Sequence, residues 1–115
     1  MSSDATRSAV FDLASAAIRS GQYHVSEHAY DEAVQDGISI LSAVMGLPMG
    51  EVLEDYPEDL RGPSCLTLCQ AAGKPVHLVV GYDKGAKRAI IITVYRPDPA
   101  RWSDDFRRRR DKHGK

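Results

Sequence analysis

Apolar residues recur three or four positions apart through the first half of the chain, a spacing that places them on one face of a helix. The expected helices are residues 5–20, residues 27–36 and a third segment from Ser39 to the stop at Pro48. Ser26 and Gly37 flank the second segment, because serine is favoured as an N-cap and glycine just beyond a helix C-terminus. Pro48 ends the third, since proline cannot continue a helix.

From residue 50 the apolar period changes to two, the repeat of a strand with one buried face. Strands are expected at residues 51–56, 65–70, 76–82 and 89–96. Short glycine-containing turns separate the last three, which predicts a meander. The sequence therefore predicts an α+β fold, with N-terminal helices packed on one face of an antiparallel sheet of three to four strands. We expect a single domain over residues 5–105 and a flexible basic tail over residues 106–115.

Loop lengths predict the register of the sheet. Five-residue connections would place Gln70 opposite Val76 and Tyr82 opposite Arg88. The face beneath the helices would then carry Leu66, Leu68, Val76, Leu78, Val80, Tyr82, Ile90, Ile92 and Val94. The opposite face would carry a cross-strand row of Cys69, His77 and Thr93, with Tyr95 nearby.

The composition is that of one small globular domain, since the 115 residues are 43% hydrophobic and 27% charged. No segment approaches the roughly 18 apolar residues of a membrane span, and the N-terminus lacks the basic start of a secretory signal. We therefore expect a cytoplasmic protein with no membrane partner. Cys65 and Cys69 fall in one predicted strand, about 13 Å apart, which is too far for a disulfide and unsuited to a shared metal ion. We expect two buried thiols, no metal and no cofactor.

Charge is divided between the two halves of the chain. Residues 1–60 hold two basic and eleven acidic residues, whereas residues 61–115 hold thirteen basic and five acidic ones. Much of the basic excess lies in residues 107–115, which include no apolar side chain that could dock the segment. This run is either a solvated terminus or a contact for a polyanion such as RNA.

His28 is the first candidate for proton transfer. The predicted second helix places it in the first turn, with Asp31 and Glu32 three and four residues later on the same face. A histidine beside carboxylates can act as a general acid, but surface histidines with acidic neighbours are also common, so both interpretations stay open.

His77 is the second candidate. It lies in an apolar strand, where both ring nitrogens need partners, and Thr93, Tyr95 and Cys69 are positioned to supply them. His77 is therefore either a satisfied structural histidine or a site residue on an open sheet face. Nucleophilic catalysis by a Cys69 thiolate is disfavoured, because the sequence identifies no third group to orient the pair.

Several segments together resemble the bacterial family called domain of unknown function 4258: residues 26–29, 36–39, 50–57, 62–66, 75–80 and 93–102. The resemblance covers about residues 23–110, and its specificity lies in the order and spacing of the segments. It implies a helix-then-sheet fold related to RelE and BrnT toxins, which cleave RNA without metal and are neutralised by an antitoxin protein. This is a relation of fold, and fold does not determine function.

Two acidic residues depart from the family pattern. Family members commonly have arginine four and eight positions after the histidine of the His-Ala pair, and this chain has Glu32 and Asp36 there. The charge is reversed at both positions. Any role of those arginines in holding phosphate is absent from this chain.

Two classes of function remain. The first is a toxin-like, metal-independent RNA-cleaving or RNA-binding domain, in which His77 or His28 transfers a proton and Tyr95 contributes to the site. The residues expected to bind its substrate are Arg88, Arg96, Arg101 and Thr93. The second is a non-catalytic interaction module. Its acidic helical half would meet a basic surface, either on another copy in a homo-oligomer or on a different partner. The reversed charges at Glu32 and Asp36 favour the second.

Overall fold

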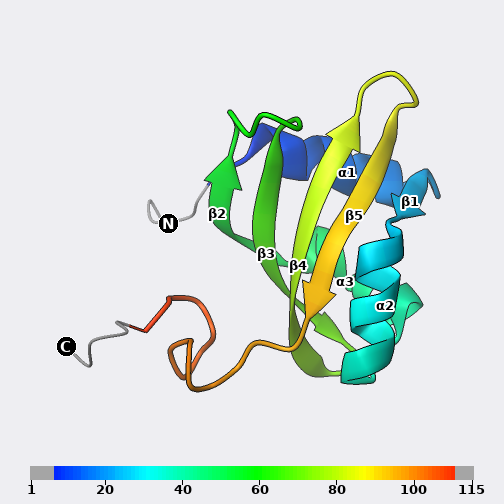
Figure 1. The fold of residues 1–115 in the computed structure, drawn as a ribbon. Helices are drawn as coiled ribbons and strands as arrows, with labels where there is room; N and C mark the ends of the chain where they lie inside the picture. Colours follow the sequence, from blue (N-terminus) through cyan, green and yellow to red (C-terminus); the bar gives the residue numbers. More distant parts are fainter. Residues whose placement is uncertain (1–6, 111–115) are drawn as a thin grey trace.

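The computed structural model describes residues 7–110, and Figure 1 shows their path. The helices within this range are α1 (Ala9–Arg19), α2 (Glu27–Asp36) and α3 (Ile40–Gly46), followed by the 3₁₀ turn η1 (Leu47–Met49). The strands are β1 (Tyr23–Val25), β2 (Glu51–Tyr56), β3 (Ser64–Ala71), β4 (Lys74–Asp83) and β5 (Arg88–Tyr95). They form one sheet in the order β1-β5-β4-β3-β2. The expected α+β class is confirmed.

The sheet differs from the expected one in strand number and direction. β1 pairs in parallel with β5, while the other neighbouring strands are antiparallel. Over residues 7–110 the sheet is therefore mixed and five-stranded, and the expectation of an antiparallel sheet of three to four strands is wrong. Three residues are too few to show a period of two, which is why β1 was missed. The relation to RelE-like folds stays a prediction.

Serine side chains determine where the helices begin. The Oγ atom of Ser26 accepts a hydrogen bond from the Ala29 N–H at 3.0 Å, and Gly37 at the other end adopts a φ of 66°, so α2 has the predicted bounds. Ser8 caps α1 in the same way through the Phe11 N–H at 3.1 Å. This cap starts α1 later than the expected residue 5; residues 5 and 6 lie outside the described range.

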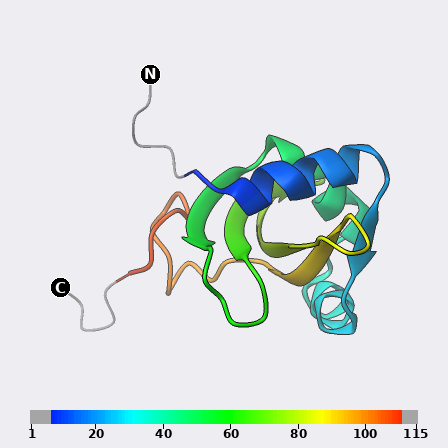
Figure 2. The same ribbon diagram turned by 90° about the horizontal axis from the view of Figure 1, so that it is seen from above.

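The helices occupy two different places around the sheet. α1 packs on β4 and β5 and α3 on β3, so both cover the same face (Figures 1 and 2). Between them lies a core whose largest fully buried side chains include Ile18, Leu47, Leu78 and Ile91. α2 instead lies along β5 at the side of the sheet. No helix in the described part of the chain is long and apolar enough to span a membrane.

β1 pairs only with the first residues of β5. Beyond them, side chains of α2 accept hydrogen bonds from the backbone N–H groups at the free edge of β5. The backbone N–H of Val94 donates to the Oε1 atom of Glu32 at 3.1 Å, and that of Arg96 donates to the Oδ2 atom of Asp36 at 3.0 Å. These are the two positions where the resembling family commonly has arginine. An arginine has no acceptor atom, so the acidic residues have a structural reason to be there.

Both predicted hairpin registers are wrong by one residue. Gln70 pairs with Pro75, and Tyr82 pairs with Ala89. A one-residue slip moves a whole strand to the other face. Leu66 and Leu68 therefore lie on the face away from α1, and the core beneath the helices contains Cys65, Cys69, Ala71, Val76, Leu78, Val80, Ala89, Ile91 and Val94.

A bulge in β5 explains why Ile92 does not lie on the predicted face of the sheet. Val79 pairs with Thr93 and Val80 with Ile91, so Ile92 has no partner across the strand. Ile91 and Val94 are consequently both 0% exposed although they are three residues apart. The expectation that Ile92 belongs to the core is wrong, because the bulge turns this half-buried side chain to the other face.

Truncation of the two neighbouring isoleucines tests this bulge. We expect Ile91→Ala to lower the free energy of unfolding by about 2–5 kcal/mol, because it leaves a cavity in a packed core. Ile92→Ala should cost clearly less, because half-buried Ile92 lies outside the core. Urea unfolding with an unchanged m-value measures both, and equal losses would contradict the assigned register.

The edge contact of Glu32 can be tested separately. Glu32→Leu should destabilise the protein by about 1–3 kcal/mol, since the Val94 N–H loses its acceptor, whereas Glu32→Gln keeps an oxygen and should cost less. Asp31→Leu, on the exposed side of α2, is the matched control in urea unfolding. A loss from Glu32→Leu no larger than that from Asp31→Leu would show that the edge contact does not matter.

Candidate functional site

His77 lies at the centre of a small cluster on the sheet face away from α1. It pairs across the strands with Leu68 on β3 and Tyr95 on β5. It is 0% exposed. The indole ring of Trp102 packs edge to face against the imidazole, with ring centroids 4.3 Å apart. Residues 102–110, which we call the C-terminal strap, thus cover a histidine that would otherwise face solvent.

Both ring nitrogens of His77 have partners. The Nε2 atom lies 2.8 Å from the carbonyl oxygen of Phe106, so it carries the hydrogen and donates. The Nδ1 atom then accepts from the Tyr95 hydroxyl at 3.2 Å. Burial lowers the pKa of His77. The imidazole is therefore neutral and fully hydrogen-bonded, as expected of a structural histidine.

Ion pairs hold the C-terminal strap against β2. Arg109 donates to both carboxylate oxygens of Glu54 at 3.0 Å, and its guanidinium lies 4.7 Å from the centre of the Trp102 ring. Arg107 donates to Glu51 at 2.8 Å. The hydrogen bonds from Arg109 hold the pKa of the Glu54 carboxyl below its ordinary value.

Two of the arginines in these contacts, Arg107 and Arg109, belong to the segment that the sequence predicts to be a flexible tail. The structure places residues 106–110 against the sheet, and the rest of that segment, residues 111–115, lies outside the described range. The expected domain boundary at residue 105 stays a prediction. The basic side chains that we expected to be available for RNA are partly engaged, because Arg107, Arg109 and Arg110 each contact a carboxylate.

A cavity of about 340 Å³ opens beside the Trp102 ring. Three guanidinium groups, two aromatic rings and one carboxylate surround it. We call it the arginine–aromatic cavity, lined by Tyr95, Arg96, Asp98, Arg101, Trp102 and Arg109. The side chain of Arg96 is held in place by the carbonyl oxygens of Asp36 and Gly37, whereas that of Arg101 is 81% exposed and lies 4.0 Å from Asp98.

The structure brings together some of the predicted site residues and separates others. Tyr95, Arg96 and Arg101 meet at this cavity. Thr93 lies on β5 opposite Val79, two pairs along from Tyr95.

Two predicted residues are elsewhere. Arg88 is at the opposite end of β5 and pairs with Asp83. His28 is exposed on α2, where its Nε2 atom lies 3.3 Å from Glu32. Neither residue lines the arginine–aromatic cavity.

The cysteines do not contribute to this cluster. Cys69 faces α3, with its Sγ atom 4.0 Å from the Ala43 carbonyl oxygen, so the predicted row of Cys69, His77 and Thr93 is wrong. Both thiols are free and buried, as expected, and burial raises the pKa of each to about 11. Among residues 7–110, no group of three or more His, Cys, Asp or Glu side chains could hold a metal ion.

The sequence favours Trp102 as a cap on the edge of the core or a subunit contact, and Trp102 is buried. Its contact with His77, and the pairing of Arg109 with Glu54, were not expected. The available signal was charge, because β2 is acidic and residues 107–110 are basic. The basic run has no apolar periodicity, so its sequence predicts a tail and not a segment that docks on the sheet.

A family model described as domain of unknown function (DUF4258) matches residues 25–96, well over half of the chain. No curated protein and no solved structure matches. The matched range contains His28, His77 and Tyr95 but ends at Arg96. The strap that buries His77 therefore lies beyond the matched range.

The buried, neutral state of His77 predicts a pH dependence of stability. Because its pKa is lowered on folding, the unfolded chain binds more protons once the pH falls below the ordinary value of 6.5. Wild-type protein should therefore lose stability between about pH 7.5 and about pH 5.5. His77→Gln should be less stable at the higher pH and should lose less on acidification, because the titrating ring is gone.

Urea unfolding at each pH measures this difference. Trp102 is the single tryptophan, so its fluorescence reports in the same experiment whether the strap stays docked. Parallel pH profiles for wild type and His77→Gln would contradict a neutral, buried imidazole.

Proposed function

The chain belongs to the DUF4258 family, whose description assigns no activity, and we propose that it binds RNA through the arginine–aromatic cavity without cleaving it. The observation that supports this is the convergence of Arg96, Arg101 and Arg109 with Tyr95 and Trp102 in one cavity of about 340 Å³. Guanidinium groups bind phosphate by paired hydrogen bonds, and aromatic side chains contact bases. Single-stranded RNA presents both groups together.

The three arginines have different roles in this proposal. Arg96 and Arg109 are already oriented, by backbone carbonyls and by Glu54 respectively. A preoriented guanidinium loses less entropy when it meets a phosphate. Arg101 has only the long contact to Asp98, so it is the cation most available to a phosphate.

His77 does not supply a cleavage step in this geometry. Its two nitrogens are occupied by Phe106 and Tyr95, and it is fully buried. A general acid or base must reach the proton that it transfers. His28 on α2 does not line the cavity either. Toxin-like RNA cleavage and an antitoxin partner stay predictions from the family resemblance.

The interaction-module hypothesis is favoured by a separate observation on the helices. Four apolar side chains are 49–69% exposed, as two pairs each four residues apart: Tyr30 and Val34 on α2, and Leu41 and Met45 on α3. Exposed apolar side chains at helical spacing are typical of a surface that packs on a partner. The partner stays unspecified.

Substitution of Arg101, the most exposed of the three arginines that line the cavity, tests RNA binding. Arg101→Gln should weaken binding of a fluorescein-labelled, single-stranded 12-nucleotide RNA by about tenfold, as expected for loss of a hydrogen bond to a charged group. The slope of log affinity against log salt concentration should fall by about one. Arg19→Gln is the matched control, because Arg19 is exposed at the end of α1, away from the cavity.

Fluorescence anisotropy measures affinity, and gel analysis of the same RNA in EDTA measures cleavage. Equal affinities for wild type, Arg101→Gln and Arg19→Gln would overturn the proposed site. Cleavage by wild type that disappears in His77→Gln would overturn the non-catalytic assignment.

A further inference from the structure

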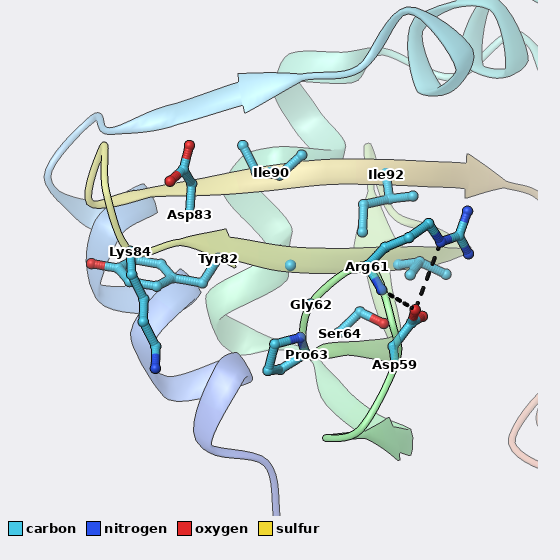
Figure 3. Close-up of a pocket in the computed structure, with 12 residues that line it drawn as sticks. Asp59, Arg61, Gly62, Pro63, Ser64, Tyr82, Asp83, Lys84, Ile90 and Ile92 are labelled. Atoms are coloured by element: carbon cyan, nitrogen blue, oxygen red, sulfur yellow. Dashed lines mark hydrogen bonds and ion pairs between the residues drawn. The ribbon is translucent and has the colours of Figure 1, made fainter.

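A second cavity lies on the same sheet face as His77, on the half that the C-terminal strap leaves uncovered. It has a volume of about 530 Å³ and lies between the β2–β3 loop and the β4–β5 hairpin (Figure 3). Val79, Ile90 and Ile92 line it with aliphatic side chains, and Pro63 and Tyr82 also contribute. The cavity is therefore aliphatic where the sheet lines it, and polar side chains from the two loops and strand ends also line it: Asp59, Arg61, Ser64, Asp83 and Lys84.

Gly81 keeps this hollow open. A Cβ atom on Gly81 would lie 3.2 Å from the Cδ1 atom of Ile92 and 3.4 Å from the carbonyl oxygen of Pro63. Glycine inside a strand often marks a place where another group approaches closely. A larger side chain at this position would partly fill the hollow.

An apolar side chain lies at the edge of this cavity without entering it. Leu60 is 102% exposed. Its neighbours Asp59 and Arg61 line the cavity, but Leu60 does not. Figure 2 shows the β2–β3 loop, which carries Leu60, projecting from the sheet on the side away from α1. The β2–β3 loop thus carries a fully exposed leucine between two residues that line the cavity.

We propose that a second copy of this chain occupies the cavity, with Leu60 of each copy inserted into the hollow of the other. In a two-fold dimer each surface contacts its own equivalent, so a protrusion and a hollow on one face complement each other reciprocally. The same two-fold axis pairs the β2–β3 loop of one copy with the β4–β5 hairpin of the other.

The charges around the cavity fit this arrangement. Asp59 is engaged by the backbone N–H of Arg61 at 3.0 Å, and Asp83 caps the hairpin through the Gly85 N–H. Among the described residues, Glu58 in the β2–β3 loop and Lys84 in the hairpin have no ion-pair partner. Two-fold pairing brings Glu58 of one copy towards Lys84 of the other.

The contact is small, so the dimer should be weak and should form at about 0.1–1 mM protein. Sedimentation equilibrium of the full chain across this range should show a mass rising from monomer to dimer. Leu60→Asp should weaken association at least tenfold. Because Leu60 is fully exposed, this change leaves the fold of the monomer intact. Leu41→Asp is the matched control, because Leu41 is an exposed leucine on α3.

A mixing experiment separates reciprocal insertion from general apolar association. Ile92→Lys should also prevent self-association, since it places a charge in the cavity. An equimolar mixture of the Leu60→Asp and Ile92→Lys chains should form a heterodimer. Leu60 of the Ile92→Lys chain enters the native cavity of the other chain, and the introduced aspartate meets the introduced lysine in the second cavity. Fluorescent labelling of one chain measures this by sedimentation velocity.

Each outcome of these experiments either supports or overturns the proposed dimer. Wild type that remains monomeric at about 1 mM, including the case in which its cavity binds the dye 8-anilinonaphthalene-1-sulfonate, overturns the proposal. Dimerisation that survives Leu60→Asp, or that is lost in Leu41→Asp, places the interface elsewhere and also overturns it. Loss in Leu60→Asp alone, with association restored by mixing, supports it.

Discussion

The hydrogen bonding of β5 is the constraint on which the rest of the structure depends. One edge of this strand pairs with β4, and the other must be satisfied by several different partners. β1 pairs with its first residues, and the carboxylates of Glu32 and Asp36 accept from the N–H groups of Val94 and Arg96. A buried N–H without a partner would cost a large part of the stability of a small domain. α2 is therefore bound to the edge of the sheet by polar side chains as well as by Ala29 and Ala33, which belong to the core, while α1 and α3 pack on the face.

Part of the charge division along the chain is neutralised by ion pairs within the molecule. Acidic β2 and the basic C-terminal strap meet through the pairs Glu51–Arg107 and Glu54–Arg109. Exposed ion pairs alone contribute little. Here they accompany two buried contacts, the packing of Trp102 on His77 and the hydrogen bond from His77 to Phe106. The strap thus covers one half of the sheet face, and the arginine–aromatic cavity opens beside it.

This arrangement divides the sheet face away from α1 into two regions with different chemistry. Near the end of β5, guanidinium and aromatic groups surround a cavity suited to a polyanion. At the other end, Val79, Ile90 and Ile92 provide an aliphatic surface inside a cavity that the two loops border. The first supports RNA binding and the second supports self-association, and neither depends on the other. His77, a candidate for proton transfer in the sequence, contacts the strap through the Phe106 carbonyl oxygen and the Trp102 ring.

The sequence by itself determined the features that depend on neighbouring residues. The bounds of α2 and β2 followed from Ser26, Gly37 and a local change of period. The contact between His77 and Tyr95 was also predictable, because strand alternation places both side chains on the same sheet face. The register, the bulge at Ile92 and the strap were not. The strap depends on contacts between residues far apart in the chain, such as Glu54 with Arg109. The register and the bulge depend on turn geometry and on which face of each strand is buried, as the pairs Gln70–Pro75 and Val80–Ile91 show. Only the packed tertiary structure decides such contacts, because a local pattern shows which face of an element is apolar but not what will lie against its polar edge.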